Sequence, residues 1–199
     1  MNARTAGSRR GTRQGGATAV EFALVLPVFF LLFYGMLTYG FIFLMRLGLQ
    51  HAAEDGARAA LRYPAICSAA APCDPAERQQ RQFNERLTAA YTTAIQQAGW
   101  MDFRSDRQPL SVSSRICSVG QGCGAGDAGV LVCDRADCAT GAPPVCDSGL
   151  GVGCQVVVTI TYDYASAPFL PRITGFGLVT PSSLSGQARI LLDGRALAS

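Results

Sequence analysis

The longest uninterrupted apolar stretch of the chain lies close to its N-terminus. From Phe22 to Met45 the sequence contains no charged residue and is rich in Phe and Leu. A helix of this length extends about 36 Å, which exceeds the hydrocarbon core of a bilayer, roughly 30 Å. The pattern therefore predicts a membrane-spanning helix, because a buried core helix would be shorter and less apolar on all sides.

The helical pattern continues past this stretch. Residues 46–63 are rich in Ala, and Glu54 precedes Arg58 at the i,i+4 spacing that favours an ion pair along a helix. Pro64 is expected to end the helix. The sequence therefore predicts one long N-terminal helix, half in the membrane and half outside it.

A second helix is predicted between Pro75 and Gly99. Asp74 suits the N-cap position, Pro75 suits the first helical position, and Glu77 has the spacing of a capping box. The residues expected on its apolar face repeat at helical spacing: Phe83, Leu87, Tyr91, Ile95 and Ala98. We expect this face to contact the core.

Strand patterns occupy the second half of the chain. The strongest covers residues 154–165, and weaker ones cover 110–117, 130–133 and 187–193. Helices followed by strands indicate an α+β fold with an antiparallel sheet. The Gly-, Cys- and Asp-rich segment 118–153 is expected to be a disulfide-stapled loop. The apolar connection 165–182 is expected to enter the core or to contact a partner protein or a membrane leaflet.

The positive charge of the chain is concentrated in its first residues. All 17 cationic side chains are Arg, against 14 acidic ones, and Arg4, Arg9, Arg10 and Arg13 precede Gly16 with no acid among them. The rest of the chain is nearly neutral, which argues against a body that binds nucleic acid. An Arg cluster before an apolar helix predicts a cytoplasmic N-terminus.

All the cysteines follow the apolar stretch, and their even number indicates pairing in an oxidising compartment. They are Cys67, Cys73, Cys117, Cys123, Cys133, Cys138, Cys146 and Cys154. Eight cysteines allow on the order of 100 pairings, so the connectivity stays open. Only Cys133 and Cys138 have a spacing that zinc sites use, and no C-x-x-C is present. Structural disulfides are therefore favoured.

No constellation for catalysis, a cofactor or a metal is predicted. His51 is the single histidine and flanks the apolar stretch, where a Ser-His-Asp triad is implausible. Asp127, Asp134, Asp137 and Asp147 lack the spacing of a calcium loop. We therefore expect a protein that is not an enzyme and takes no small-molecule substrate.

Glu21 stands at the start of the apolar stretch, where a carboxylate costs free energy unless it is partnered or reaches the headgroups. One interpretation places it in the headgroup layer near Arg13. In the other, a protease cuts after Gly16, so that Ala17 carries a new α-ammonium. Ala17 and Glu21 share a helical face, and their charges would compensate one another within a subunit or between neighbours.

The order of basic leader, Gly16, four residues, Glu21-Phe22 and apolar helix resembles the substrates of prepilin peptidases. Type IV pilins usually have Phe directly after the cleaved glycine, whereas this chain has Ala17. The segment with Ala17 after Gly16 is instead similar to the TadE-like family of the tight-adherence (Flp) pilus. The resemblance covers residues 11–64. It implies processing at Gly16 and Ala17, a recognition or assembly role for Glu21 and Phe22, and a minor pseudopilin-like component. The implied partners are a prepilin peptidase, a related pseudopilin and the pilus assembly platform.

Three parts are therefore expected: a basic leader (1–16), a transmembrane and extended helix (17–63), and an exported cysteine-rich α+β domain (64–199). The expected location is the bacterial inner membrane, crossed once, with the C-terminal domain periplasmic or extracellular. Two alternatives stay open. One is an uncleaved, signal-anchored periplasmic binding or structural module with a stapled loop. The other is a membrane-tethered redox or metal protein.

Overall fold

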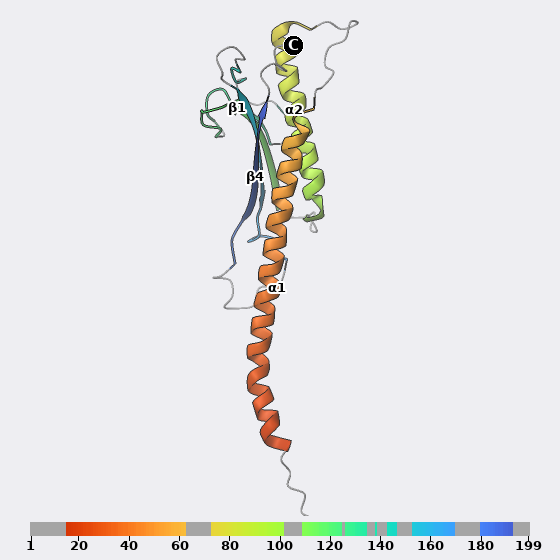
Figure 1. Cartoon of the computed structure of the whole chain (residues 1–199), viewed down its shortest axis with the longest axis vertical. Helices are drawn as coiled ribbons and strands as arrows, with labels where there is room; N and C mark the ends of the chain where they lie inside the picture. The colour runs from red at the N-terminus through yellow and green to blue at the C-terminus, as the bar shows by residue number, and fades with distance from the viewer. Residues whose placement is uncertain are drawn as a thin grey trace, which may run out of the picture. The chain divides into compact units, whose positions relative to one another are not determined.

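The computed structural model describes residues 15–62, 73–101, 109–124, 126–134, 138, 143–146, 153–169 and 180–192. The chain divides into two compact units, Met1–Phe41 and Ile42–Ser199. The elements in chain order are α1 (Gly15–Ala59), α2 (Pro75–Ala98), the 3-10 turn η1 (Gly99–Met101), β1 (Leu110–Ser118), β2 (Leu131–Cys133), β3 (Cys154–Tyr162) and β4 (Leu184–Leu192) (Figure 1). The predicted α+β class is confirmed.

The long N-terminal helix is present as α1, and the boundary between the two units falls inside it. It ends at Ala59, slightly before the predicted stop at Pro64. The last turn tightens, because Leu61 and Arg62 donate their N–H groups to carbonyls three residues back, those of Arg58 and Ala59. This geometry closes the helix before proline is needed to end it.

The four strands form one antiparallel sheet in the order β2-β1-β3-β4. At its centre, Val156 pairs with Ile116 of β1 and with Ile190 of β4. The strongest predicted strand ends earlier than expected, at Tyr162. The Asp163 carboxylate accepts the N–H groups of Ala165 and Ser166, and this local turn takes the chain out of the sheet.

Helix α2 covers the predicted span, but two details of the prediction are wrong. The Asp74 side chain makes no capping hydrogen bond, so the capping box is not formed, and Glu77 pairs with Arg81 instead. The buried face consists of Phe83, Leu87, Ala90, Ala94 and Ala98, while Ile95 is exposed. A strict four-residue repeat drifts around a helix with 3.6 residues per turn, so the core face includes a three-residue step.

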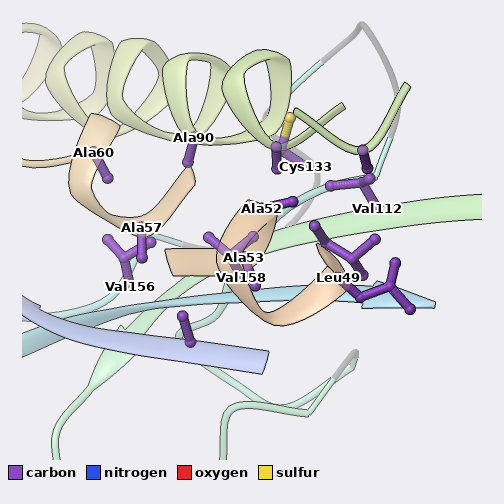
Figure 2. Packing of buried hydrophobic residues seen from close by; sticks show 14 of the residues in the cluster. Leu49, Ala52, Ala53, Ala57, Ala60, Ala90, Val112, Cys133, Val156 and Val158 are labelled. Atoms are coloured by element: carbon purple, nitrogen blue, oxygen red, sulfur yellow. The ribbon is translucent and has the colours of Figure 1, made fainter. Parts of the chain in front are cut away.

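The core of the Ile42–Ser199 unit joins the C-terminal part of α1, helix α2 and one face of the sheet. Figure 2 shows small residues of α1 and of the turn after it packed beside Ala90 of α2 and Val158 of β3: Ala52, Ala53, Ala57 and Ala60. Gly56 is the closest point, since a Cβ there would meet the Ala90 carbonyl oxygen and the Ala94 Cβ at 2.9 Å. Small side chains are therefore what allow the two helices to approach.

Disulfides attach the cysteine-rich segment to one end of the sheet. The pairs are Cys117–Cys123, Cys133–Cys138 and Cys146–Cys154, each between neighbours in the sequence. Cys117, Cys133 and Cys154 lie on three adjacent strands. The prediction that these six cysteines form intramolecular bridges is confirmed. Cys73 is also disulfide-bonded, and Cys67 lies outside the described residues.

The apolar connection 165–182 is described at its two ends. Ala167 is buried and its carbonyl accepts the Tyr162 hydroxyl at 2.8 Å, while Phe169 packs against the core. This end follows the core interpretation of the segment. Residues 170–179 lie outside the described residues.

Candidate functional site

The predicted processing segment forms the first turns of α1. Gly16 and Glu21 are exposed, and the Phe22 side chain is 65 % exposed. Ala17 and Glu21 stand one helical turn apart, as expected from their i,i+4 spacing. Glu21 forms no ion pair with any of the described residues, so its carboxylate is available to another group. The roles assigned to these residues stay predictions.

Large apolar side chains cover the rest of α1 in the Met1–Phe41 unit. Leu24, Val25, Val28 and Met36 are each more than half exposed. Thr38 also lies in this part of α1, and its hydroxyl donates to the Tyr34 carbonyl at 2.8 Å, so it presents no unsatisfied hydroxyl proton. In the described part of the chain, α1 is the one helix long and apolar enough to cross a membrane. One apolar N-terminal helix of this kind fits a single-pass anchor.

Pro27 lies inside this apolar part of α1. Proline has no N–H group, so it cannot donate to the carbonyl of Ala23, the residue one turn earlier. An unsatisfied carbonyl is costly in a hydrocarbon environment. A donor from another group or a local bend would satisfy it.

The contacts found among the described residues at the cysteine-rich end of the sheet are a hydrogen-bonded turn and disulfides. Asp127 accepts the Gly124 N–H at 2.7 Å, closing a turn next to the Cys117–Cys123 bridge. Groups of three or more potential metal ligands are absent from the described residues. Asp134 is exposed, and Asp137 and Asp147 lie outside the described residues.

A shallow groove of about 370 Å³ runs between α1 and the edge strand β4. Its lining residues are Gln50, Glu54, Ala57, Arg58, Gln187, Ala188, Arg189 and Ile190. Gln50 bridges the groove, because its side-chain amide donates to the Gln187 carbonyl at 3.1 Å and its carbonyl oxygen accepts the Gln187 N–H at 3.3 Å. Arg58 is held by Glu54 and Asp55 at 3.9 and 3.4 Å. These contacts hold a helix against a strand, and they form no catalytic set.

Sequence reasoning missed the polar contacts that fix α1. Arg86 of α2 is buried, and its Nη1 donates to the Ala60 carbonyl at 3.1 Å, just beyond the C-terminus of α1. The negative end of the α1 dipole also stabilises a cation at this position. Gln50 and Gln187 are 137 positions apart. Gln50 lies in an Ala-rich helix and Arg86 in a polar one, so neither residue stood out in the sequence as a contact that fixes α1.

These features define a class of protein: a single apolar N-terminal helix suited to a membrane, followed by an α+β unit stapled by disulfides. Residues 16–58 match the family model described as TadE-like protein. The resemblance inferred from the sequence is thereby confirmed over this segment, which lies entirely within α1. Comparisons with curated proteins and with solved structures found no match. The match supports a pseudopilin-type role associated with the tight-adherence pilus.

Proposed function

We propose that this protein is a minor, non-enzymatic pseudopilin-like component of tight-adherence pilus assembly, cleaved by a prepilin peptidase between Gly16 and Ala17. The observation that carries the proposal is the TadE-like match, which begins at Gly16 and runs along α1. The implied partners are the peptidase, a related pseudopilin and the pilus assembly platform. None of these requires a cofactor or a small-molecule substrate on this chain.

The proposed topology places the N-terminus in the cytoplasm and the Ile42–Ser199 unit outside the bacterial inner membrane. Two independent features support it. Arg residues cluster before the apolar stretch, and positive charge flanking a membrane helix stays on the cytoplasmic side. The disulfides lie in the other part of the chain, and such bridges persist in oxidising compartments.

The proposed cleavage site suits a protease because it can open at low cost. Gly15 and Gly16 begin α1, where the first N–H groups have no intrahelical acceptor. Glycine is also about 1 kcal/mol less favourable than Ala within a helix. Few hydrogen bonds therefore oppose an extended conformation of the bond between Gly16 and Ala17 in a peptidase active site.

N-terminal sequencing and intact mass of the membrane-extracted protein test the processing step. Wild type is expected to start at Ala17, and Gly16→Val is expected to keep the full leader because its β-branched side chain crowds the scissile bond. Gly11→Val changes a glycine upstream of the site and should be cleaved normally. An intact Met1 in wild type, or equal masses for wild type and Gly16→Val, would favour the uncleaved, signal-anchored module instead.

The role of Glu21 is tested separately from cleavage. After processing, the Ala17 α-ammonium and the Glu21 carboxylate would face one another across one helical turn or between neighbouring subunits. Glu21→Gln removes that charge at nearly constant size, so we expect pilus assembly to be lost while the protein remains membrane-inserted. Asp55→Asn, a charge removal further along α1, should assemble normally. Normal piliation by Glu21→Gln would reject an assembly role for the carboxylate.

A further inference from the structure

Four large apolar side chains remain exposed at one end of the Ile42–Ser199 unit. Phe43, Leu44 and Leu47 of α1 are 64, 53 and 46 % exposed, and Trp100 of η1 is 43 % exposed. We call these four residues the apolar rim. They are contributed by two elements that are far apart in sequence, so the rim is a surface of the folded unit.

Trp100 is held firmly in this rim although nearly half of it is exposed. A Cβ at Gly48 would lie 2.6 Å from the Trp100 Cζ2, so the indole ring rests directly on the backbone of α1. Glycine at position 48 is what makes room for it. The antiparallel course of α1 and α2, with Ala60 near Arg86 and Gly56 near Ala90, brings η1 to this level of α1.

The rim begins where the apolar stretch of α1 ends. Phe43 and Leu44 belong to the charge-free stretch, and Arg46, which is exposed, is the first charge after it. Gly48 lies less than one helical turn, about 4.5 Å, beyond Met45. The headgroup layer of a bilayer is about 5–7 Å thick on each side. A helix that spans the hydrocarbon with this stretch therefore carries Gly48 and Trp100 at headgroup depth.

We propose that the apolar rim is a lipid-docking surface that seats the Ile42–Ser199 unit on the membrane, with Trp100 as its anchor in the headgroup layer. The chemistry fits this layer, because an indole has an apolar body and one N–H donor and is enriched at membrane interfaces. Arg46, the first charge after the apolar stretch, can supply a cation for lipid phosphates. The surface is continuous with the membrane-spanning stretch, which identifies lipid as its occupant.

The proposal needs only that α1 spans a bilayer. Both the precursor and a chain cleaved after Gly16 keep the rim, so failure of the proposed processing or pilus role would leave this inference standing. Docking at two separate elements, α1 and η1, would also restrict how the unit tilts relative to the membrane plane. A single helix passing into solvent would leave that tilt less restricted.

Trp100 is the single tryptophan of the chain, so its emission reports on this site alone. The purified full-length protein is reconstituted into phosphatidylcholine vesicles containing lipids brominated either near the headgroup or near the chain terminus. We expect the shallow bromines to remove on the order of half of the emission and the deep bromines to remove much less. Acrylamide dissolved in the water should quench Trp100 weakly.

The matched control moves the reporter to another exposed site of the same unit. In Trp100→Phe combined with Leu191→Trp, the indole replaces a side chain that is 66 % exposed on β4. That site lies about 16 Å further along the strand from Gly186, which contacts α1 at Leu49. It should be quenched strongly by acrylamide and hardly by bromine.

Two outcomes would overturn the proposal. Equal acrylamide quenching of Trp100 and of the control would place the rim in water. Protection of Trp100 from acrylamide without quenching by shallow bromines would mean that protein, such as a second copy of this chain, covers the rim.

Discussion

Gly186 of β4 is the position where a single methyl group should disturb the fold most clearly. A Cβ at this residue would lie 2.5 Å from the carbonyl carbon of Leu49, 2.6 Å from its oxygen and 2.7 Å from the amide nitrogen of Gln50. All three atoms belong to the backbone of α1, so no side-chain rotation relieves the clash. Gly186→Ala therefore forces α1 and β4 apart.

The magnitude follows from the contacts that this separation changes. Overpacking by one methyl in a well-packed core costs about 1–3 kcal/mol. The two hydrogen bonds between Gln50 and Gln187 sit next to the clash, and weakening each removes up to about 1 kcal/mol. Replacing glycine within a strand by alanine recovers about 0.5–1 kcal/mol. The net expectation is a loss of about 1–3 kcal/mol of unfolding free energy.

Thermal unfolding in detergent under non-reducing conditions, followed by Trp100 emission, measures this loss. For a unit of this size 1 kcal/mol shifts the melting temperature by about 2–4 °C, so Gly186→Ala should melt about 2–12 °C below wild type. Gly99→Ala is the matched control, since its Cβ would meet nothing within 4 Å and its φ of −58° suits alanine. Equal melting temperatures for the two variants would refute the packing argument.

Two further changes test the contacts that hold α1, and a labelling experiment tests the disulfides. Arg86→Met removes the hydrogen bond to the Ala60 carbonyl and should lower the unfolding free energy by about 1–3 kcal/mol. The control Arg81→Met, on the exposed face of α2, should lower it by less than about 0.5 kcal/mol in the same melt. Equal losses would contradict a special role for the buried guanidinium. Gln50→Leu removes both hydrogen bonds to the Gln187 backbone of β4, so the unfolding free energy from denaturant titration should fall by about 1–2 kcal/mol. An unchanged midpoint would contradict this expectation. Thiol labelling of unreduced, denatured protein should find at most one reactive cysteine per chain; more would contradict the even pairing.

Elements whose residues carry their own local pattern could be predicted from the sequence. The apolar stretch of α1 needed no partner to be recognised, because lipid accepts any apolar side chain. Strand β3 alternates clearly, and the even number of cysteines after the apolar stretch indicated disulfide pairing. The connectivity of the cysteines required the structure, because each bridge joins a strand residue to a cysteine outside the sheet and spacing alone left many pairings open.

Features that depend on a distant partner could not be predicted. Strand β4 begins at Leu184, before the predicted start at 187, because Leu184 pairs with Tyr162 and Gly186 pairs with Ile160. Glycine weakens a strand pattern in sequence, yet Gly186 is present because the α1 backbone passes directly over it. The predicted core position of Ile95 was wrong for a different reason, since a strict four-residue repeat drifts around the helix and places Ala94 on the buried face instead.

The size of the buried and exposed side chains along α1 explains how one helix can serve two environments. Its exposed apolar residues are large through Leu47, while the residues it buries from Ala52 onward are small. Lipid tails conform to any shape, so bulk is acceptable there and maximises the apolar area removed from water. A sheet and a second helix cannot conform in this way, and close backbone approach requires Ala or Gly at the contact. The large apolar side chains end at Leu49 and the small buried ones begin at Ala52, so the change falls just after Gly48, where Trp100 rests on the helix. The sequence itself therefore indicates a transition from lipid to protein packing near this turn.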